Sequence, residues 1–338
     1  MIQTKDKIKA LAVVGNIIKK TSREELSLTA KWAKKYNNWF TEDAVLHRLD
    51  HIANSFLNIE KLEKYADKYT TSEKHAVVGM VLDARIPAEG IQDIIALVMS
   101  GYKCRVKLNE QDKYLMTYLL ELFSEIEPGF KQLIIPSSQL KDVDALVATV
   151  NDKNEAYYNK YLSDKKLLLR KEKRAVAIIP YDYTVEEMQA TGKDIFNYYG
   201  LARWNIGQLL VPENFNFQIF IEALDRFREV QKNHRYTNHY DYNKSLLLVN
   251  REHHYDSGFL VIRNNDEVIS PIATLNYSVY SNENEMYAIL AASSDHISAV
   301  VSKTAINTSI PITTPGYATA PELWEFPAGE NFIEALNG

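Results

Sequence analysis

The sequence predicts an α/β fold with two α/β domains and a set of N-terminal helices. Three observations predict it. Apolar residues recur at helical spacing over residues 1–70, short apolar runs then alternate with helix-like stretches up to residue 179, and the alternation restarts after residue 180. Continuous apolar runs that alternate with helices are typical of a parallel, doubly wound sheet that is buried on both faces.

In the first half, Thr21 to Glu25 (Thr-Ser-Arg-Glu-Glu) forms a helix entry with an acidic residue just inside, and Thr41 caps another helix. The predicted strands are 75–82, 104–108, 133–136, 144–148, 167–169 and 175–179. The predicted helices between them are 91–100, 111–126 and 154–162. Strands that alternate with helices in this way indicate a parallel sheet.

In the second half, helices are predicted over 185–200, 217–230 and 282–290. Strands are predicted over 208–211, 246–249, 259–262 and 273–277, and residues 300–302 precede a loop-rich tail. We therefore divide the chain into residues 1–178, with the N-terminal helices and a Rossmann-like cofactor-type domain, and residues 179–338, a catalytic-type α/β domain with a C-terminal tail.

Composition limits the classes of function. A length of 338 residues with 46% hydrophobic and 25% charged residues is ordinary for a globular protein with a large core. The net charge is −5, whereas a nucleic-acid-binding protein usually has a basic face and a high isoelectric point. The apolar run 10–15 is interrupted too soon for a signal peptide or a membrane span, so we expect a cytoplasmic protein. Cys104 is the single cysteine, which excludes a disulfide framework and a cysteine zinc site.

Residues 200–205 (Gly-Leu-Ala-Arg-Trp-Asn) resemble the segment that holds the nucleophilic cysteine in bacterial acyl-CoA reductases of the luminescence (LuxC-like) type, relatives of the aldehyde dehydrogenases. In that family the turn reads roughly Gly-Leu-Gly-Cys-Arg-Asn. Residues 238–244 (Asn-His-Tyr-Asp-Tyr-Asn-Lys) are the most distinctive of the other matches. Further matching segments are 37–43, 86–87, 100–108, 192–205, 236–250, 256–259, 270–272 and 321–324. The resemblance implies an aldehyde-dehydrogenase-like fold.

The chain departs from this family where the chemistry is done. Arg203 stands in the place of the nucleophilic cysteine, and Arg85 stands in the place of an asparagine that is expected to donate to the oxyanion. Where the family has Ala-Thr-Gly-Ser beside the nicotinamide, this chain has Val150 and Asn151. Lys107 occupies the position of the lysine on the adenosine side. A guanidinium stays protonated and does not attack a carbonyl, so no catalytic residue is assigned.

Several readings of these residues stay open. Each arginine either pairs with a nearby carboxylate or, together with the other, favours an anionic ligand. The basic run 165–174 is either a solvated edge or a phosphate contact. Cys104 on its predicted strand is either a buried structural thiol or a reactive one. The histidines 234, 239, 253 and 254 lack the spacing of a metal site, so we expect no metal.

The resemblance leads to one main hypothesis and two alternatives. The main one is an acyl-CoA-reductase-like protein that has lost thioester reduction and acts as a ligand-binding or partner subunit, with acyl-CoA or a related acyl thioester as its ligand. NADPH or NADH is the cofactor that the family implies. The alternatives are an active NAD(P)H-dependent reductase with altered site chemistry and a purely structural partner of an active paralogue. We expect no nucleic-acid partner, and either a homo-oligomer or a complex with that paralogue.

Overall fold

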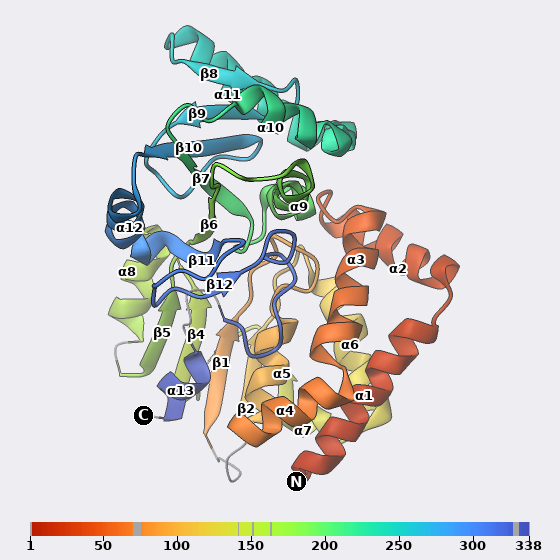
Figure 1. The fold of residues 1–338 in the computed structure, drawn as a ribbon. Coiled ribbons are helices and arrows are strands. Elements are labelled where there is room, and N and C mark those ends of the chain that lie inside the picture. Colours follow the sequence, from red (N-terminus) through yellow and green to blue (C-terminus); the bar gives the residue numbers. More distant parts are fainter. Residues whose placement is uncertain are drawn as a thin grey trace. The chain divides into compact units, whose positions relative to one another are not determined.

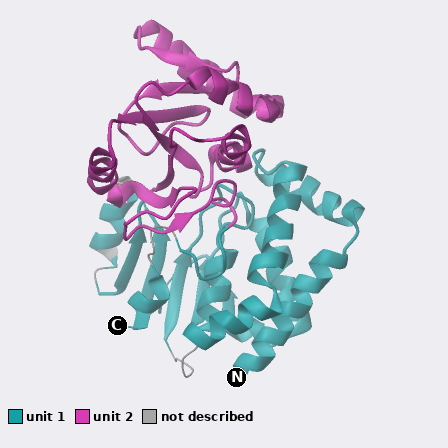
Figure 2. Cartoon of the chain, viewed as in Figure 1, with its two compact units in different colours: residues 1–171, 321–326, 331–338 teal, residues 172–320, 327–330 magenta. Residues whose placement is uncertain are grey.

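The computed structural model describes residues 2–69, 76–140, 142–150, 152–162, 164–326 and 331–337 (Figure 1). The chain forms two compact units, coloured separately in Figure 2. Unit 1 holds Met1–Lys171, Pro321–Phe326 and Asn331–Gly338, and unit 2 holds Glu172–Ala320 and Pro327–Glu330. The division into domains at residues 178 and 179 stays a prediction. The contacts within the chain separate the units seven residues earlier and assign Pro321–Phe326 and Asn331–Gly338 of the C-terminal tail to unit 1.

Unit 1 is a five-stranded parallel sheet with helices. Its helices are α1 (Thr4–Lys20), α2 (Arg23–Tyr36), α3 (Glu42–His51), the π-helix Ile52–Phe56, α4 (Ile59–Tyr69), α5 (Ile91–Met99), α6 (Lys113–Ile126), α7 (Phe130–Leu133), α8 (Asp152–Tyr161) and α13 (Phe332–Asn337). Its strands are β1 (Val77–Val81), β2 (Lys103–Lys107), β3 (Ile134–Pro136), β4 (Ala145–Thr149) and β5 (Lys166–Arg170). They lie in the order β3-β2-β1-β4-β5, and all pairs are parallel. The predicted parallel sheet is confirmed. His75, the first residue of the predicted strand 75–82, lies outside the described residues.

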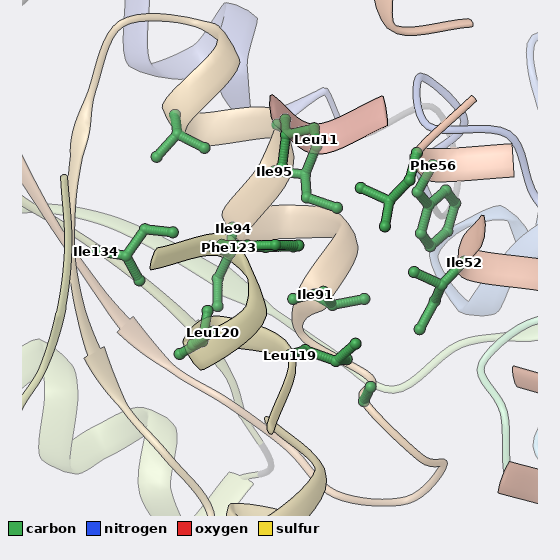
Figure 3. Close-up of a cluster of buried hydrophobic side chains, with 14 of the residues drawn as sticks. Leu11, Ile52, Phe56, Ile91, Ile94, Ile95, Leu119, Leu120, Phe123 and Ile134 are labelled. Atoms are coloured by element: carbon green, nitrogen blue, oxygen red, sulfur yellow. The ribbon is translucent and has the colours of Figure 1, made fainter. Parts of the chain in front are cut away.

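The core of unit 1 forms around α5. Every residue of this helix except Asp93 is buried, so it is covered on all sides, as a helix without a polar face must be. Figure 3 shows part of the cluster, to which α1, the π-helix, α5, α6 and β3 all contribute. The predicted helix entries are also confirmed: Ser22 and Glu25 form a capping box at α2, and Thr41 caps α3.

Unit 2 contains a seven-stranded sheet. Its strands are β6 (Arg174–Ile178), β7 (Ile206–Pro212), β8 (His254–Asp256), β9 (Val261–Asn264), β10 (Thr274–Tyr280), β11 (Ile297–Val301) and β12 (Ile312–Thr313). Its helices are α9 (Val185–Phe196), α10 (Phe217–Leu224), α11 (His234–Val249), α12 (Glu283–Ala292) and the 3-10 segments Asn197–Gly200, Asp225–Lys232 and Ser294–His296. The order is β12-β11-β6-β7-β10-β9-β8, in which only the β8–β9 pair is antiparallel among the described strands.

One predicted strand of unit 2 is wrong. Residues 246–249 are the last turn of α11 and not a strand. Four consecutive apolar residues suggested a buried strand, but only Leu247 is buried, on the same helix face as Tyr236, Tyr240 and Asn243. This 3.6-residue spacing places α11 on the sheet and leaves the other apolar residues of the run at the surface.

Candidate functional site

The loop that carries Arg203 follows a strained stretch of backbone in unit 2. After α9 the chain passes through three consecutive residues with positive φ: Tyr198 at 52°, Tyr199 at 59° and Gly200 at 75°. The left-handed region costs a tyrosine free energy that glycine avoids, and such strain persists only where the surroundings fix the backbone. Two adjacent tyrosines in this conformation therefore indicate a loop that is held in one shape.

Asn205 fixes that shape from the inside of the loop. Its Oδ1 accepts a hydrogen bond of 2.7 Å from the backbone amide of Ala202. Its Nδ2 donates to the carbonyl oxygens of Asp194 at 2.8 Å and Asn197 at 2.9 Å. Asn205 is buried, so these bonds form in a low-dielectric surrounding. The side chain thus ties the two ends of the turn to the end of α9.

Two further side chains bind the carbonyl groups of the same loop. Buried Arg174 at the start of β6 donates from Nη1 to the carbonyl oxygens of Leu201 at 3.2 Å and Ala202 at 2.6 Å. Ser298 on β11 donates from Oγ to the carbonyl oxygen of Arg203 at 2.9 Å. Arg203 itself is 8% exposed. Arg203 is therefore a buried residue on a loop that several side-chain hydrogen bonds hold in place.

Asp194 joins this loop to the segment before residue 321. The fully buried carboxylate accepts backbone hydrogen bonds from Gly316 at 2.6 Å and Thr319 at 3.3 Å. Asn197 donates to Thr319 Oγ1 at 2.8 Å, beside the same carboxylate. Burial raises the pKa of Asp194 to about 7, and the backbone amides oppose that rise without cancelling it. Sequence reasoning missed the roles of Asp194, Arg174 and Ser298, because their partners are distant in sequence. Asp194 and Asn205 lie within the matching segment 192–205, and Arg174 ends the basic run 165–174.

In unit 1, Arg85 lies in the loop after β1 and pairs with carboxylates of its own loop. Its Nε is 3.0 Å from Asp83 Oδ2 and 3.9 Å from Glu89 Oε1. The backbone amide of Arg85 donates to Glu89 Oε2 at 2.9 Å. This is the arrangement expected if Arg85 pairs with nearby carboxylates and does not bind an anionic ligand. Two carboxylates beside one guanidinium leave the loop with no local excess of positive charge.

Residues of the N-terminal helical region donate hydrogen bonds to the backbone of the loop that carries Arg85. Asn37 donates from Nδ2 to the carbonyl oxygen of Ala84 at 3.0 Å, and Arg48 donates from Nε to that of Pro87 at 3.1 Å. Arg48 Nη1 also donates to Nδ1 of His51, whose Nε2 lies 2.9 Å from the carbonyl oxygen of Pro321. Burial, and then the Arg48 guanidinium, lower the pKa of His51 to about 3. His51 is therefore a neutral link and not a general base at neutral pH.

The other predicted site residues gather at the carboxyl edge of the unit 1 sheet. Lys107 is exposed at the end of β2, paired in register with Val81 of β1. Val150 follows β4 and packs in a cluster with Leu146 and Ala148, the alternate residues of that strand. Its side chain therefore belongs to the core, and its φ is not positive. Asn151 lies outside the described residues. Arg203 belongs to the other unit.

The remaining candidates are Cys104, the basic run 165–174 and the histidines. Cys104 is fully buried on β2, and burial followed by the Asp93 carboxylate raises the pKa of its thiol. The basic run is divided between β5 and β6, and its Arg170 makes a two-pronged ion pair with Asp93 at 2.6 and 3.1 Å. Over the described residues, no group of three or more histidine, cysteine and acidic side chains could hold a metal ion. In that same part of the chain, no helix has both the length and the apolar character of a membrane span.

Comparison with known proteins identifies the fold. No protein-family model matches the sequence, and no curated protein matches it. An aldehyde dehydrogenase from Bacillus cereus, solved with NAD+, superposes with a TM-score of 0.66 at 15% identity over 90% of this chain and 72% of that one. Propionaldehyde dehydrogenase from the fucose utilisation microcompartment of Clostridium phytofermentans gives 0.63 at 10% identity over 94% and 84%. An NADP-dependent enzyme from E. coli gives 0.65 at 11% identity over 96% and 77%. The predicted α/β fold is confirmed: this chain has the aldehyde dehydrogenase fold.

Proposed function

We propose that this protein is an acyl-CoA-reductase-like (LuxC-like) member of the aldehyde dehydrogenase superfamily that no longer reduces thioesters. It acts instead as a ligand-binding or partner subunit in the cytoplasm. The observation that carries the proposal is Arg203, a buried arginine on the loop where the family it resembles has its nucleophile. The strained residues before that loop and the bonds of Asn205 and Arg174 support a retained active-site scaffold.

The missing step is covalent. In a thioester reductase a cysteine thiolate attacks the acyl-CoA carbonyl, CoA leaves as its thiol, and the acyl group stays on the enzyme as a new thioester. Arg203 offers no free electron pair at working pH, because a guanidinium keeps its proton. Substrate binding does not replace a nucleophile, so we expect binding without turnover.

Cys104 does not take over the role. Its thiol is fully buried within the unit 1 sheet, and its raised pKa keeps it protonated at neutral pH. Only a thiolate attacks a carbonyl efficiently. This argues against the alternative of an active reductase that uses the single cysteine of the chain.

The unit 1 sheet fits the adenosine half of a nicotinamide dinucleotide, NADPH or NADH. Its strand order reverses between β1 and β4, and open α/β sheets bind nucleotides at the carboxyl ends of the strands beside such a reversal. Lys107 is exposed at this edge and would pair with a phosphate or hydrogen-bond a ribose. When bound, such a cofactor supplies a hydride. The carboxylates of Asp83 and Glu89, which lie beside Arg85, would repel an anionic ligand group at that loop.

Pure protein incubated with NADPH and a panel of acyl-CoAs tests the proposal directly. We expect no aldehyde from the wild type and an increase in melting temperature with CoA esters or dinucleotides, because a ligand at 100 times its Kd stabilises by about 2.7 kcal/mol. Steady aldehyde production by the wild type would overturn the proposal. Co-purification with an active, cysteine-bearing paralogue tests the partner role separately.

A restored thiol tests the position itself. We expect Arg203→Cys to accept an acyl group from acyl-CoA, seen as an added acyl mass on the intact protein, while the wild type and Arg203→Ala gain none. The wild type is a clean reference because its one thiol, Cys104, is buried. If Arg203→Cys folds and stays unacylated with every acyl-CoA, residue 203 is not at the point of attack, and the resemblance fails there.

A further inference from the structure

Helix α2 of unit 1 presents apolar side chains to solvent. Leu28 is 53% exposed, Trp32 49% and Tyr36 50%. Their spacing of four residues places them along one face of a helix. On the opposite side, Ala30 and Ala33 are the buried residues of α2. Large apolar side chains in a row at the surface mark an interaction site more often than single ones do.

The stripe is reinforced by aromatic contacts. Tyr114 of α6 stacks against Trp32 and Tyr36, with ring centroids 6.2 and 6.1 Å apart. Lys35 places its ammonium 3.6 Å from the centroid of Trp32. Tryptophan and tyrosine are enriched at the centres of protein interfaces, because they bury a large area with few rotatable bonds. We name Leu28, Trp32, Tyr36 and Tyr114 the α2 patch.

The charges on α2 change along the helix: Arg23, Glu24 and Glu25 give its start a net negative charge, and Lys31, Lys34 and Lys35 make its second half basic. Glu24 and Glu25 lie in the first turn, and Lys34 and Lys35 lie in the last. Glu24 and Lys35 are eleven positions apart, which at 3.6 residues per turn is about three full turns, so both lie on one line along the helix. Glu24 precedes Leu28 by four residues and Lys35 follows Trp32 by three, so this line borders the α2 patch.

We propose that two copies of this chain associate through α2, with the two helices antiparallel about a two-fold axis at the level of Ala30. The midpoint between Leu28 and Trp32 is position 30, and the midpoint between Glu24 and Lys35 lies half a residue away. In this register each Leu28 packs on Trp32 of the second copy, and each Glu24 faces Lys35 of the second copy.

The charge order selects the antiparallel arrangement. Two parallel α2 helices would set Glu24 against Glu24 and Lys35 against Lys35, and like charges repel. A two-fold axis instead repeats one favourable pair twice, as expected of a self-complementary dimer contact. The α2 helix of 14 residues is about 21 Å long. One helix pair of this length buries less than the roughly 1,200–2,000 Å² of a standard interface, so we expect a weak, reversible dimer.

Sedimentation velocity of the full chain over a range of protein concentrations tests this surface. We expect a concentration-dependent shift from monomer to dimer that Trp32→Ala abolishes. Tyr181→Ala removes a 75% exposed aromatic ring elsewhere and should leave the dimer unchanged. Circular dichroism of each variant confirms that the fold is kept. A chain that stays monomeric at all concentrations, or a dimer that Trp32→Ala leaves intact, overturns the proposal.

Charge reversal tests the register. We expect Glu24→Lys and Lys35→Glu each to weaken the dimer several-fold, because each creates two like-charge contacts across the axis. The double variant should restore most of the affinity, and high salt should reduce these differences. Lys34→Glu changes the same charge outside the facing line and should have little effect. Failure of the double variant to recover contradicts the antiparallel register.

Discussion

Replacing Asn205 by alanine measures how firmly the Arg203 loop is held. The substitution removes one hydrogen bond from the amide of Ala202 at 2.7 Å and bonds from Nδ2 to the carbonyl oxygens of Asp194 at 2.8 Å and Asn197 at 2.9 Å, with a longer one to Ile195 at 3.4 Å. Each such bond contributes about 1 kcal/mol net, and each partner that is left buried without a bond adds its own cost. We expect Asn205→Ala to lower the free energy of unfolding by about 3 kcal/mol.

Urea unfolding followed by circular dichroism measures this loss. With a slope of about 1–3 kcal/mol/M, a loss of about 3 kcal/mol moves the midpoint down by about 1–3 M. Asn250→Ala is the matched control, because Asn250 is exposed and its amide makes one surface bond to Glu252 at 3.3 Å. Its midpoint should change by the equivalent of less than about 0.5 kcal/mol.

Asn205→Asp adds a signature that depends on pH. A carboxylate at this buried position would face the carbonyl oxygens of Asp194 and Asn197, so its pKa should rise above the unfolded value of about 3.9. The folded state then holds a proton that the unfolded state has lost, and the stability of the variant relative to the wild type should fall as pH rises from about 4. A loss below about 1 kcal/mol in Asn205→Ala, or an Asn205→Asp curve parallel to that of the wild type, would refute the reasoning.

Three further predictions concern groups that are fully or partly buried. Native protein should react with a thiol reagent at Cys104 only as fast as it unfolds, and immediate labelling would contradict the burial of this side chain. Arg170→Ala leaves the partly buried Asp93 without its two-pronged partner and should lower the free energy of unfolding by about 1.5–3 kcal/mol in chemical denaturation, whereas a loss below about 1 kcal/mol would mean that the pair is dispensable. The folded-state pKa of Asp194 of about 7 lies above the unfolded value of about 3.9. The contribution of this carboxyl is therefore greatest below pH 4 and is lost as pH rises to 7. Asp194→Asn should gain melting temperature relative to the wild type from pH 5 to pH 8, and a constant difference would be the contrary result.

Sequence reasoning recovered the fold where burial is local to an element. The apolar runs before Leu82 and around Leu146 are strands covered on both faces, and such strands carry their signal within five residues. The run ending at Val249 failed because its four residues fit a strand and a helix equally well. Only its contacts with the sheet separate the two.

The candidate site was predictable in part. The resemblance pointed to Arg203 and its loop, and the structure places that residue buried on a fixed turn. The side chains that fix the turn were not predictable, because Arg174 and Ser298 act from 28 and 95 residues away in the sequence. Hydrogen bonds of that kind depend on sheet order, which a single sequence does not contain.

The division of unit 1 between the two ends of the chain has a consequence for its synthesis on the ribosome. Gln92 donates to the carbonyl oxygens of Glu322 and Glu325, and the hydroxyl of Tyr102 donates to Oδ1 of Asn337. Phe332 packs in the same core as the first helix. These C-terminal residues are translated more than 200 residues after Gln92 and Tyr102. Unit 1 is therefore incomplete during synthesis, with part of its apolar surface uncovered, until its C-terminal segments follow unit 2 out of the exit tunnel.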